Sequence, residues 1–267
     1  NAGGESSAQV NITEDGNVAV TTGHPDIGGS RASIANITAE LLGIDVNRVS
    51  VMIGDTATIG FSNLTGGSRV LFASALVVTE STNQVIDILK DRASKIWDID
   101  KDAIEWENGE ARPAGDNAGK FKPLSLVELA EKATPTGGPI GAGHQVNTVG
   151  AEGGFATHIC DVEVDIELGI ARIIRYTAAQ DVGKAIHPAY VEGQLQGGVV
   201  QGIGWALNEE YIYNKEGKLD NPGFLDYRIP VCSDLPMIDT ILVEVPNPKH
   251  PQGVRGVGEV PIVPPLS

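Results

Sequence analysis

Residues 161–168 (DVEVDIEL) alternate acidic and apolar side chains without interruption. Successive side chains of a β-strand point to opposite faces, so this period of two predicts a strand with a solvated acidic face. A calcium site on the acidic stripe is the alternative, which is disfavoured because carboxylates on one extended strand do not wrap around an ion. Residues 171–178 are predicted to pair with it across a turn at Leu168-Gly169. A helix over residues 188–210 and a strand over residues 238–245 follow.

The first half of the chain mixes strands and helices in the same way. Its predicted elements are a hairpin over residues 8–20, a helix containing residues 34–41 and closed by Gly43, a strand over 49–53, a long helix over 70–97, a second hairpin around 105–110 and a short helix over 126–133. Regular βαβ alternation is absent. The sequence therefore predicts an α+β fold of mixed sheets and helices rather than a doubly wound one.

A stretch rich in glycine and proline, residues 135–143 (PTGGPIGAG), separates the two halves. We interpret it as a linker, which predicts one α+β domain over residues 1–143 and another over 144–267. A dinucleotide-binding fingerprint is the alternative. It is disfavoured because Pro139 lies inside the stretch and no strand-to-helix context surrounds it.

Composition narrows the functional classes. The chain has 267 residues, a formal charge of −16 and 41% hydrophobic residues, so it has enough apolar residues for a packed core but no basic surface for nucleic acid or an anionic membrane. Cys160 and Cys232 lack CxxC spacing, which argues against a cysteine-based metal site within this chain and favours a cytoplasmic location. Because the chain begins at Asn1 without Met, we expect it to be a fragment or one piece of a longer polypeptide.

Glycine is enriched, with 33 residues, and the first notable cluster is a repeat. Residues 28–31 and 66–69 both read Gly-Gly-Ser-Arg, and each precedes a predicted helix. Successive glycines let backbone N–H groups turn toward a ligand, and a helix N-terminus favours an anion such as a diphosphate. Two ordinary helix caps, made by Ser30 and Ser68, are the alternative interpretation.

The second cluster is residues 193–204 (GQLQGGVVQGIG) within the predicted helix 188–210. Each glycine costs a helix about 1 kcal/mol relative to alanine, so something must pack very close to this one. The amides of Gln194, Gln196 and Gln201 can donate and accept hydrogen bonds at once, which suits the edge of a heterocycle such as a pterin. Close helix packing with exposed glutamines stays open as the alternative.

The third cluster is residues 253–261 (GVRGVGEVP), in which Glu259 lies between glycines and proline. Burial in such an apolar neighbourhood would raise the pKa of a carboxyl and make it a usable general base. A surface-loop glutamate is the alternative. The five histidines lack the spacing of a zinc site, so a protein-held zinc ion is not predicted. No GxSxG signature of a serine nucleophile occurs either.

Together, the three clusters resemble the molybdenum-binding subunit of the molybdenum hydroxylases, the family of xanthine dehydrogenase and aldehyde oxidase. The most specific match is residues 255–259, similar to the family's Gly-Val-Gly-Glu signature, and residues 181–204 are nearly as specific. Supporting matches are residues 23–29, 67–69 and 226–230. The resemblance covers essentially the whole chain and corresponds to the C-terminal portion of that subunit.

The resemblance implies a set of site residues. Glu259 would be the base that deprotonates a molybdenum-bound hydroxyl or water, and Gln194 would hydrogen-bond the pterin. Backbone groups of two segments would contact the dithiolene, pterin or nucleotide diphosphate: Ile27, Gly28 and Gly29, and Gly66, Gly67 and Ser68. The metal would be held by the cofactor's sulfurs, and the cofactor would carry the hard chemistry.

The resemblance also implies substrates and partners. It indicates hydroxylation of an electron-poor carbon in an N-heteroaromatic, nicotinate-like compound or an aldehyde. The cofactor would be molybdopterin, in a cytosine dinucleotide form, with FAD and [2Fe-2S] clusters on partner subunits. A non-catalytic assembly or binding module, which completes a partner's site, is the alternative function.

This chain departs from the family pattern in places. Gly29 stands where the family often has glutamine, and Val260 where proline or serine often follows the glutamate. No match to the family's N-terminal molybdenum domain is found. We therefore expect either an excerpt or a subunit divided into two polypeptides, an arrangement similar to that of bacterial nicotinate dehydrogenases.

Overall fold

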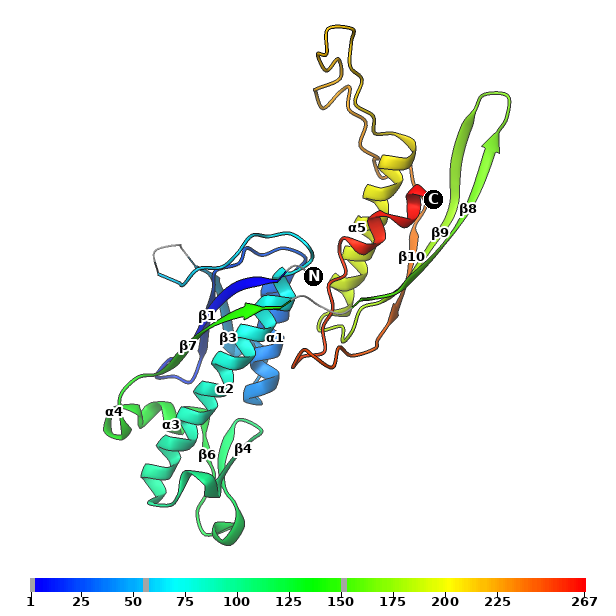
Figure 1. The fold of residues 1–267 in the computed structure, drawn as a ribbon. Coiled ribbons are helices and arrows are strands. Elements are labelled where there is room, and N and C mark those ends of the chain that lie inside the picture. The colour runs from blue at the N-terminus through cyan, green and yellow to red at the C-terminus, as the bar shows by residue number, and fades with distance from the viewer. Residues whose placement is uncertain (1–2, 55–57, 150–152) are drawn as a thin grey trace. The chain divides into compact units, whose positions relative to one another are not determined.

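The computed structural model describes residues 3–54, 58–149 and 153–267. The chain forms two compact units (Figure 1). The first comprises residues 1–151 and 248–252, and the second comprises residues 152–247 and 253–267.

The first unit is built on a four-stranded sheet with the order β3-β2-β1-β7. Its strands are β1 (Gly4–Ile12), β2 (Val18–Thr22), β3 (Val49–Ile53) and β7 (Ile140–Thr148). β1 pairs antiparallel with β2 and β7, whereas β2 and β3 are parallel and are connected through α1 (Ser30–Leu42). The long helix α2 (Val70–Trp97) packs against β1, β7 and α1.

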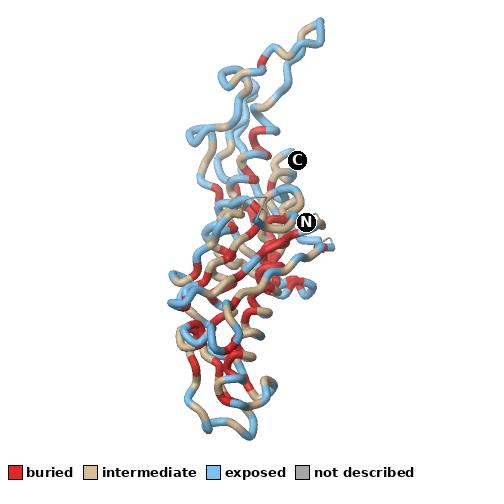
Figure 2. The backbone as a smooth tube through the Cα atoms, turned by 90° about the vertical axis from the view of Figure 1, so that its left-hand side faces the viewer, coloured by how far each residue is buried: buried red, intermediate tan, exposed pale blue. Residues whose placement is uncertain are grey.

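The core of the first unit is formed by apolar side chains that alternate along its strands and recur at helical spacing along its helices. Val10 of β1 and Val20 of β2 are fully buried, as are Ile37 and Leu42 of α1. Figure 2 draws the buried stretches of the chain in red. α1 ends at Gly43, whose φ of 69° lies in the left-handed region that ends helices at low cost for glycine.

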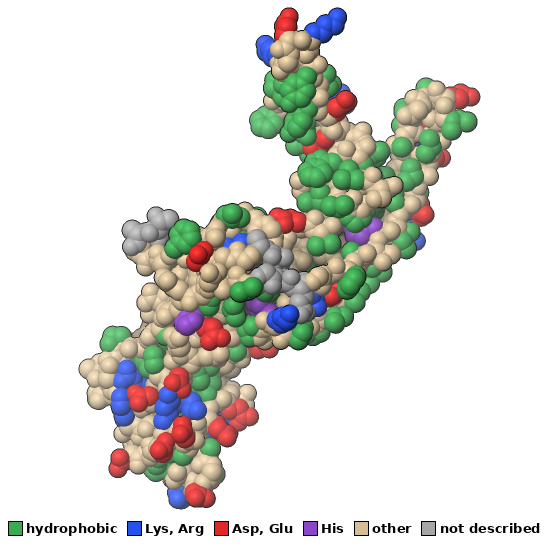
Figure 3. Space-filling view, in the orientation of Figure 1, with side chains coloured by type: hydrophobic (Ala, Val, Ile, Leu, Met, Phe, Trp, Pro, Cys, Tyr) green, Lys and Arg blue, Asp and Glu red, His purple; other side chains and the backbone are tan. Residues whose placement is uncertain are grey.

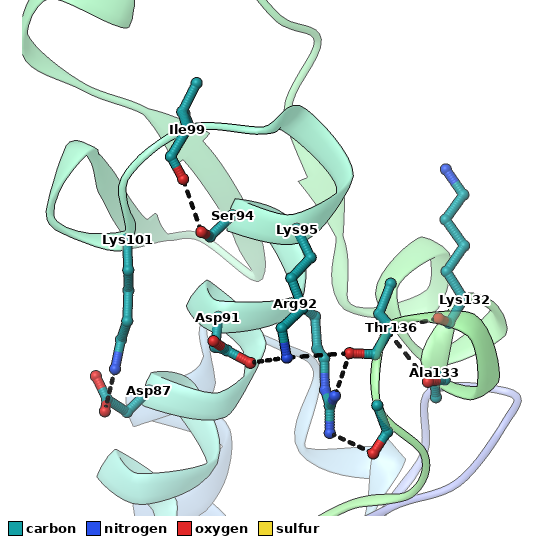
Figure 4. Close-up of polar contacts among 11 residues, drawn as sticks. Asp87, Asp91, Arg92, Ser94, Lys95, Ile99, Lys101, Lys132, Ala133 and Thr136 are labelled. Carbon is teal, nitrogen blue, oxygen red and sulfur yellow. Dashed lines mark hydrogen bonds and ion pairs between the residues drawn. The ribbon is translucent and has the colours of Figure 1, made fainter.

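A small second sheet, β4-β5-β6, and two short helices surround the C-terminal end of α2. Their bounds are β4 (Ile104–Glu107), β5 (Glu110–Pro113), β6 (Leu124–Ser125), α3 (Leu126–Glu131) and α4 (Ala133–Thr136). Figure 4 shows how α2 is tied there: the buried Arg92 donates to the carbonyls of Thr136 and Gly137. Lys95 pairs with Asp91 at 2.7 Å beside it.

The second unit has a three-stranded sheet with the order β10-β9-β8. Its strands are β8 (Ala156–Asp165), β9 (Ile170–Asp181) and β10 (Ile238–Val243), and its helix is α5 (Pro188–Leu207). β8 and β9 form an antiparallel hairpin, whereas β9 and β10 are parallel and α5 lies between them in sequence. Two 3₁₀ helices, Val260–Ile262 and Pro264–Leu266, pack against α5.

Most of the predicted elements and the α+β class are confirmed, with two differences. Residues 140–143, the last four of the predicted linker, form the start of β7, and the two units divide at residue 151. The predicted strand 161–168 ends earlier than expected, because β8 stops at Asp165 and residues 166–169 form the turn, and its apolar side is exposed as well as its acidic side. Val162, Val164 and Ile166 are all more than half exposed, and Figure 3 shows hydrophobic side chains along this hairpin.

Candidate functional site

The first Gly-Gly-Ser-Arg motif forms the turn that enters α1. Gly28 and Gly29 have φ values of 61° and 71°, a left-handed backbone that side chains disfavour. Ser30 is the first residue of α1 rather than its cap, and Gly29 occupies the cap position without a side-chain bond. Arg31 pairs with Asp26 at 3.3 Å. The motif therefore exposes the backbone of its two glycines, while its arginine forms an ion pair with a residue of the same loop.

The second motif enters α2 with a similar backbone. Gly67 and Ser68 have φ values of 68° and 53°, and Arg69, not Ser68, occupies the cap position of α2. Arg69 is completely buried and donates to four carbonyls, those of Gly4, Glu5, Asn63 and Leu64, over 2.9–3.2 Å. Burial lowers the pKa of its guanidinium, opposed by the charge of Glu5. Its role is to hold the start of β1 against the segment that precedes α2.

The structure brings the two motifs to the same end of the first sheet. One lies in the loop after β2 and the other in the segment after β3, and the carboxyl ends of parallel strands share an edge. The loops meet at Gly23, where a Cβ would collide with the Ser62 side chain. His24, one of the five histidines and part of the loop after β2, is buried and shares a hydrogen bond with the Ser6 hydroxyl at 3.0 Å. Burial, followed by the nearby charge of Arg69, lowers the pKa of His24 to about 4.

In the second unit, Gln194 and the Glu259 loop are neighbours. A Cβ on Gly258 would lie 2.9 Å from the Oε1 atom of Gln194, so the amide rests against the glycine that precedes Glu259. The helix glycines explain how the loop comes so close. A Cβ on Gly198 would lie 2.8 Å from the Gly258 carbonyl oxygen, and one on Gly202 would overlap the Ile262 carbonyl.

The other glutamines of α5 have different environments. Gln196 donates to the carbonyl of Ile238 at 3.2 Å and so ties α5 to β10, whereas Gln201 is exposed. Of the three amides, Gln194 is the one next to the Glu259 loop. Helical periodicity accounts for the difference, because residues two positions apart, such as Gln194 and Gln196, lie on different sides of a helix.

The environment of Glu259 differs from the buried one that its sequence neighbourhood predicts. It follows the glycine-rich loop and occupies the cap position of the 3₁₀ helix Val260–Ile262, but its side chain is exposed. The burial that the sequence argument assumed is therefore not found within the second unit. Val260, which directly follows Glu259, is exposed as well, whereas Val254 and Pro261 of the same loop are buried.

An ion pair that the sequence argument missed lies beside this loop. The Nε atom of Arg255 is 3.1 Å from the Oδ2 atom of Asp181, and only 10% and 11% of these side chains are exposed. Asp181 and Arg255 lie in two segments that carry the family resemblance, and nothing in their separation of 74 positions indicates the pair.

Each unit by itself offers groups that suit a densely polar ligand. Left-handed glycines at 28, 29 and 67 expose backbone without a side chain, and the cradle at Gly258, which a Cβ would fill, lies against an amide that both donates and accepts. Among the described residues, no group of three or more His, Cys, Asp or Glu side chains could hold a metal ion. No helix in the described part of the chain is long and apolar enough to cross a membrane.

Comparison with known proteins also indicates a molybdopterin-binding chain. Residues 1–236 match the family model "Molybdopterin cofactor-binding domain". A putative xanthine dehydrogenase molybdenum-binding subunit from Escherichia coli is 30% identical over 96% of this chain and 35% of its own length. A carbon monoxide dehydrogenase large chain from Hydrogenophaga pseudoflava is 26% identical over 88% of this chain and 30% of its own length.

A solved structure agrees over nearly the entire fold. Quinoline 2-oxidoreductase from Pseudomonas putida matches with a TM-score of 0.88 and 28% identity, covering 98% of this chain and 34% of that one. The chain belongs to the molybdopterin-binding family of the molybdenum hydroxylases. It spans about a third of the length of the curated relatives it matches.

Proposed function

We propose that this chain forms part of the molybdopterin-binding subunit of an enzyme that hydroxylates an electron-poor carbon with oxygen derived from water. The observation that carries the proposal is the contact of Gln194 with Gly258, because it joins an amide suited to a pterin edge to the residue before a carboxylate. That carboxylate, Glu259, is exposed and so accessible to a reacting group.

The proposed roles follow from the chemistry of each group. Glu259 would accept the proton of the oxygen that attacks the substrate, since a carboxylate within hydrogen-bond reach of that proton can act as a general base. Gln194 hydrogen-bonds the pterin, and the backbone at Ile27, Gly28 and Gly29 and at Gly66, Gly67 and Ser68 contacts the dithiolene, pterin or diphosphate. The cofactor supplies the two-electron redox chemistry when bound, while the chain orients it and provides the base.

We propose an N-heteroaromatic, nicotinate-like substrate, with an aldehyde as the second choice. Xanthine and quinoline, the compounds in two of the relatives' names, are nitrogen heterocycles. The relative named for carbon monoxide shows that membership of the family does not fix the substrate. The choice therefore depends on a direct assay with both compound classes.

The proposed assembly is a hetero-oligomer in the cytoplasm. It would combine this chain with the N-terminal molybdopterin domain, a flavin subunit carrying FAD and an iron–sulfur subunit carrying [2Fe-2S] clusters. The molybdopterin would be a cytosine dinucleotide. The two free cysteines of this chain are consistent with a reducing compartment.

The test replaces Glu259 with glutamine in the assembled enzyme. We expect kcat to fall by about 10²- to 10⁴-fold, with molybdenum and pterin content unchanged, because the substitution keeps the shape of the side chain and removes its basicity. Glu216→Gln is the matched control, since Glu216 is an exposed loop glutamate of the same unit. Hydroxylation near the wild-type rate would reject the base assignment. A complete complex without molybdenum would support a non-catalytic assembly role instead.

A further inference from the structure

We infer that Asp181, acting through Arg255, positions the loop that carries Glu259. The inference rests on the role proposed for Glu259 and concerns residues that do not touch the reacting groups. Its starting observation is the ion pair between Asp181 at the end of β9 and Arg255 in the loop.

The pair is the centre of a set of bonds rather than an isolated contact. The Nη1 atom of Arg255 donates to the Gly153 carbonyl at 3.0 Å, and its Nε atom also faces the Val245 carbonyl at 3.4 Å. Asp181 accepts a second bond through Oδ1, from the Gly183 backbone N–H at 3.0 Å. The carboxylate therefore fixes its own turn and the arginine at the same time, with two different oxygens.

The loop backbone is fixed to the same turn. The N–H of Arg255 donates to the Val182 carbonyl at 3.3 Å, and that of Lys184 donates to the Gly253 carbonyl at 2.9 Å. Two residues nearer to Glu259 than Arg255, the Val257 carbonyl accepts from the amide of the buried Gln180 at 3.3 Å. The end of β9 thus holds the loop at Gly253, Arg255 and Val257.

The opposite side of the loop rests on α5. Gly198 faces the Gly258 carbonyl and Gln194 faces the Gly258 α-carbon, so the backbone has contacts on both sides immediately before Glu259. An exposed carboxylate can act at a defined place only if its backbone is held, because misplacement by about 1 Å can cost a reaction about 10²-fold. The arrangement gives Asp181 a positioning role: without its charge, Arg255 loses its partner and the loop loses its central attachment.

The experiment compares Asp181→Asn with Asp239→Asn in the assembled enzyme. Asp239 is the matched control, because it pairs with Arg175 at 3.3 Å in the same unit, but both side chains are more than half exposed and neither bonds the loop in the described contacts. The measurements are hydrogen–deuterium exchange of the peptide spanning residues 253–259, and kcat and KM per bound molybdenum.

For Asp181→Asn we expect exchange in residues 253–259 to rise roughly tenfold or more. We expect kcat to fall roughly 10- to 100-fold with KM within about twofold of wild type. Asp239→Asn should change neither quantity. Arg255→Lys keeps the charge but loses the fork of donors, so its exchange should lie between wild type and Asp181→Asn. If Asp181→Asn fails to assemble, the same measurements on Arg255→Lys test the inference.

Two results would overturn the inference: exchange equal to that of wild type in Asp181→Asn and Arg255→Lys, or a fall in kcat without a rise in exchange. Failure of the proposed function looks different. In that case Glu259→Gln would hydroxylate normally, while the exchange measurement would still report whether Asp181 fastens the loop.

Discussion

At the scale of single residues, the contact between Gly258 and Gln194 depends on the missing side chain at position 258. A Cβ there would lie 2.9 Å from the Gln194 Oε1 atom, so Gly258→Ala must push the amide away. If Gln194 bonds the pterin, we expect the purified complex to lose cofactor several-fold, with little change in Tm because the displaced group is the flexible end of a side chain. Molybdenum and pterin analysis measures this.

Gly193→Ala is the control, since a Cβ on Gly193 meets open space one residue before Gln194. It should retain the wild-type cofactor content. Equal cofactor content in both variants would contradict the proposal that Gln194 bonds the pterin.

His24 gives a prediction about pH. Its pKa is lowered from 6.5 to about 4, mainly by burial, so the folded protein binds this proton less readily than the unfolded chain does. The contribution of a neutral His24 to stability is therefore fully present above about pH 6.5. It is lost as the pH falls toward 4, by about 3 kcal/mol in total.

Urea unfolding between pH 7 and pH 4.5 tests this with His24→Gln. The free energy of unfolding should depend less steeply on pH in the variant than in wild type. His158 and His250, whose pKa values burial also lowers, supply part of the remaining slope. An unchanged slope would show that His24 does not titrate in this way.

At the scale of elements, α5 offers two adjacent glycines with opposite surroundings. Gly198→Ala would place a Cβ 2.7 Å from the Pro261 side chain and 2.8 Å from the Gly258 carbonyl, and overpacking of this kind costs about 1–3 kcal/mol. Gly197 faces open space, so Gly197→Ala should instead stabilise the helix by up to about 1 kcal/mol. Urea unfolding of the two variants measures the difference, and equal effects would contradict the packing of α5 on the loop.

The same helix shows what the sequence could predict. Local periodicity gives the start of α5 at Pro188, although the helix ends at Leu207 rather than at 210, and the glycine content of the helix indicates its close packing. The bounds of α2 and the hairpin of β1 and β2 also follow from local patterns. The strand β7 did not follow. Its Gly141 reads as a loop residue, yet it is required because the Asn11 side chain of β1, distant in sequence, occupies the space a Cβ would take. The exposure of Glu259 and the Asp181–Arg255 pair likewise depend on contacts between distant segments.

At the scale of the whole molecule, both units repeat one topology. Each has an antiparallel hairpin, a helix and a third strand parallel to the second: β1-β2-α1-β3 and β8-β9-α5-β10. In each unit a candidate segment follows the third strand, ending in Gly66–Ser68 or in Glu259. Ligands commonly bind at the carboxyl ends of parallel strands, and this topology puts both segments there. In each unit an arginine also bonds that segment: the fully buried Arg69 in the first unit and Arg255, whose side chain is 10% exposed, in the second.

This parallel predicts that Arg69 stabilises the first unit by its fork of donors rather than by its charge. Arg69→Lys keeps the charge, but a single ammonium cannot reach all four carbonyls of Gly4, Glu5, Asn63 and Leu64. Leaving buried acceptors unpaired should cost about 2–4 kcal/mol. Hydrogen–deuterium exchange should therefore rise in β1 and not in the β8–β9 hairpin. Arg48→Lys is the control, since the Arg48 bond to the Asp15 carbonyl is at the surface and its loss should leave exchange in β1 near wild type. Equal exchange in β1 of the two variants would mean that the charge alone is sufficient.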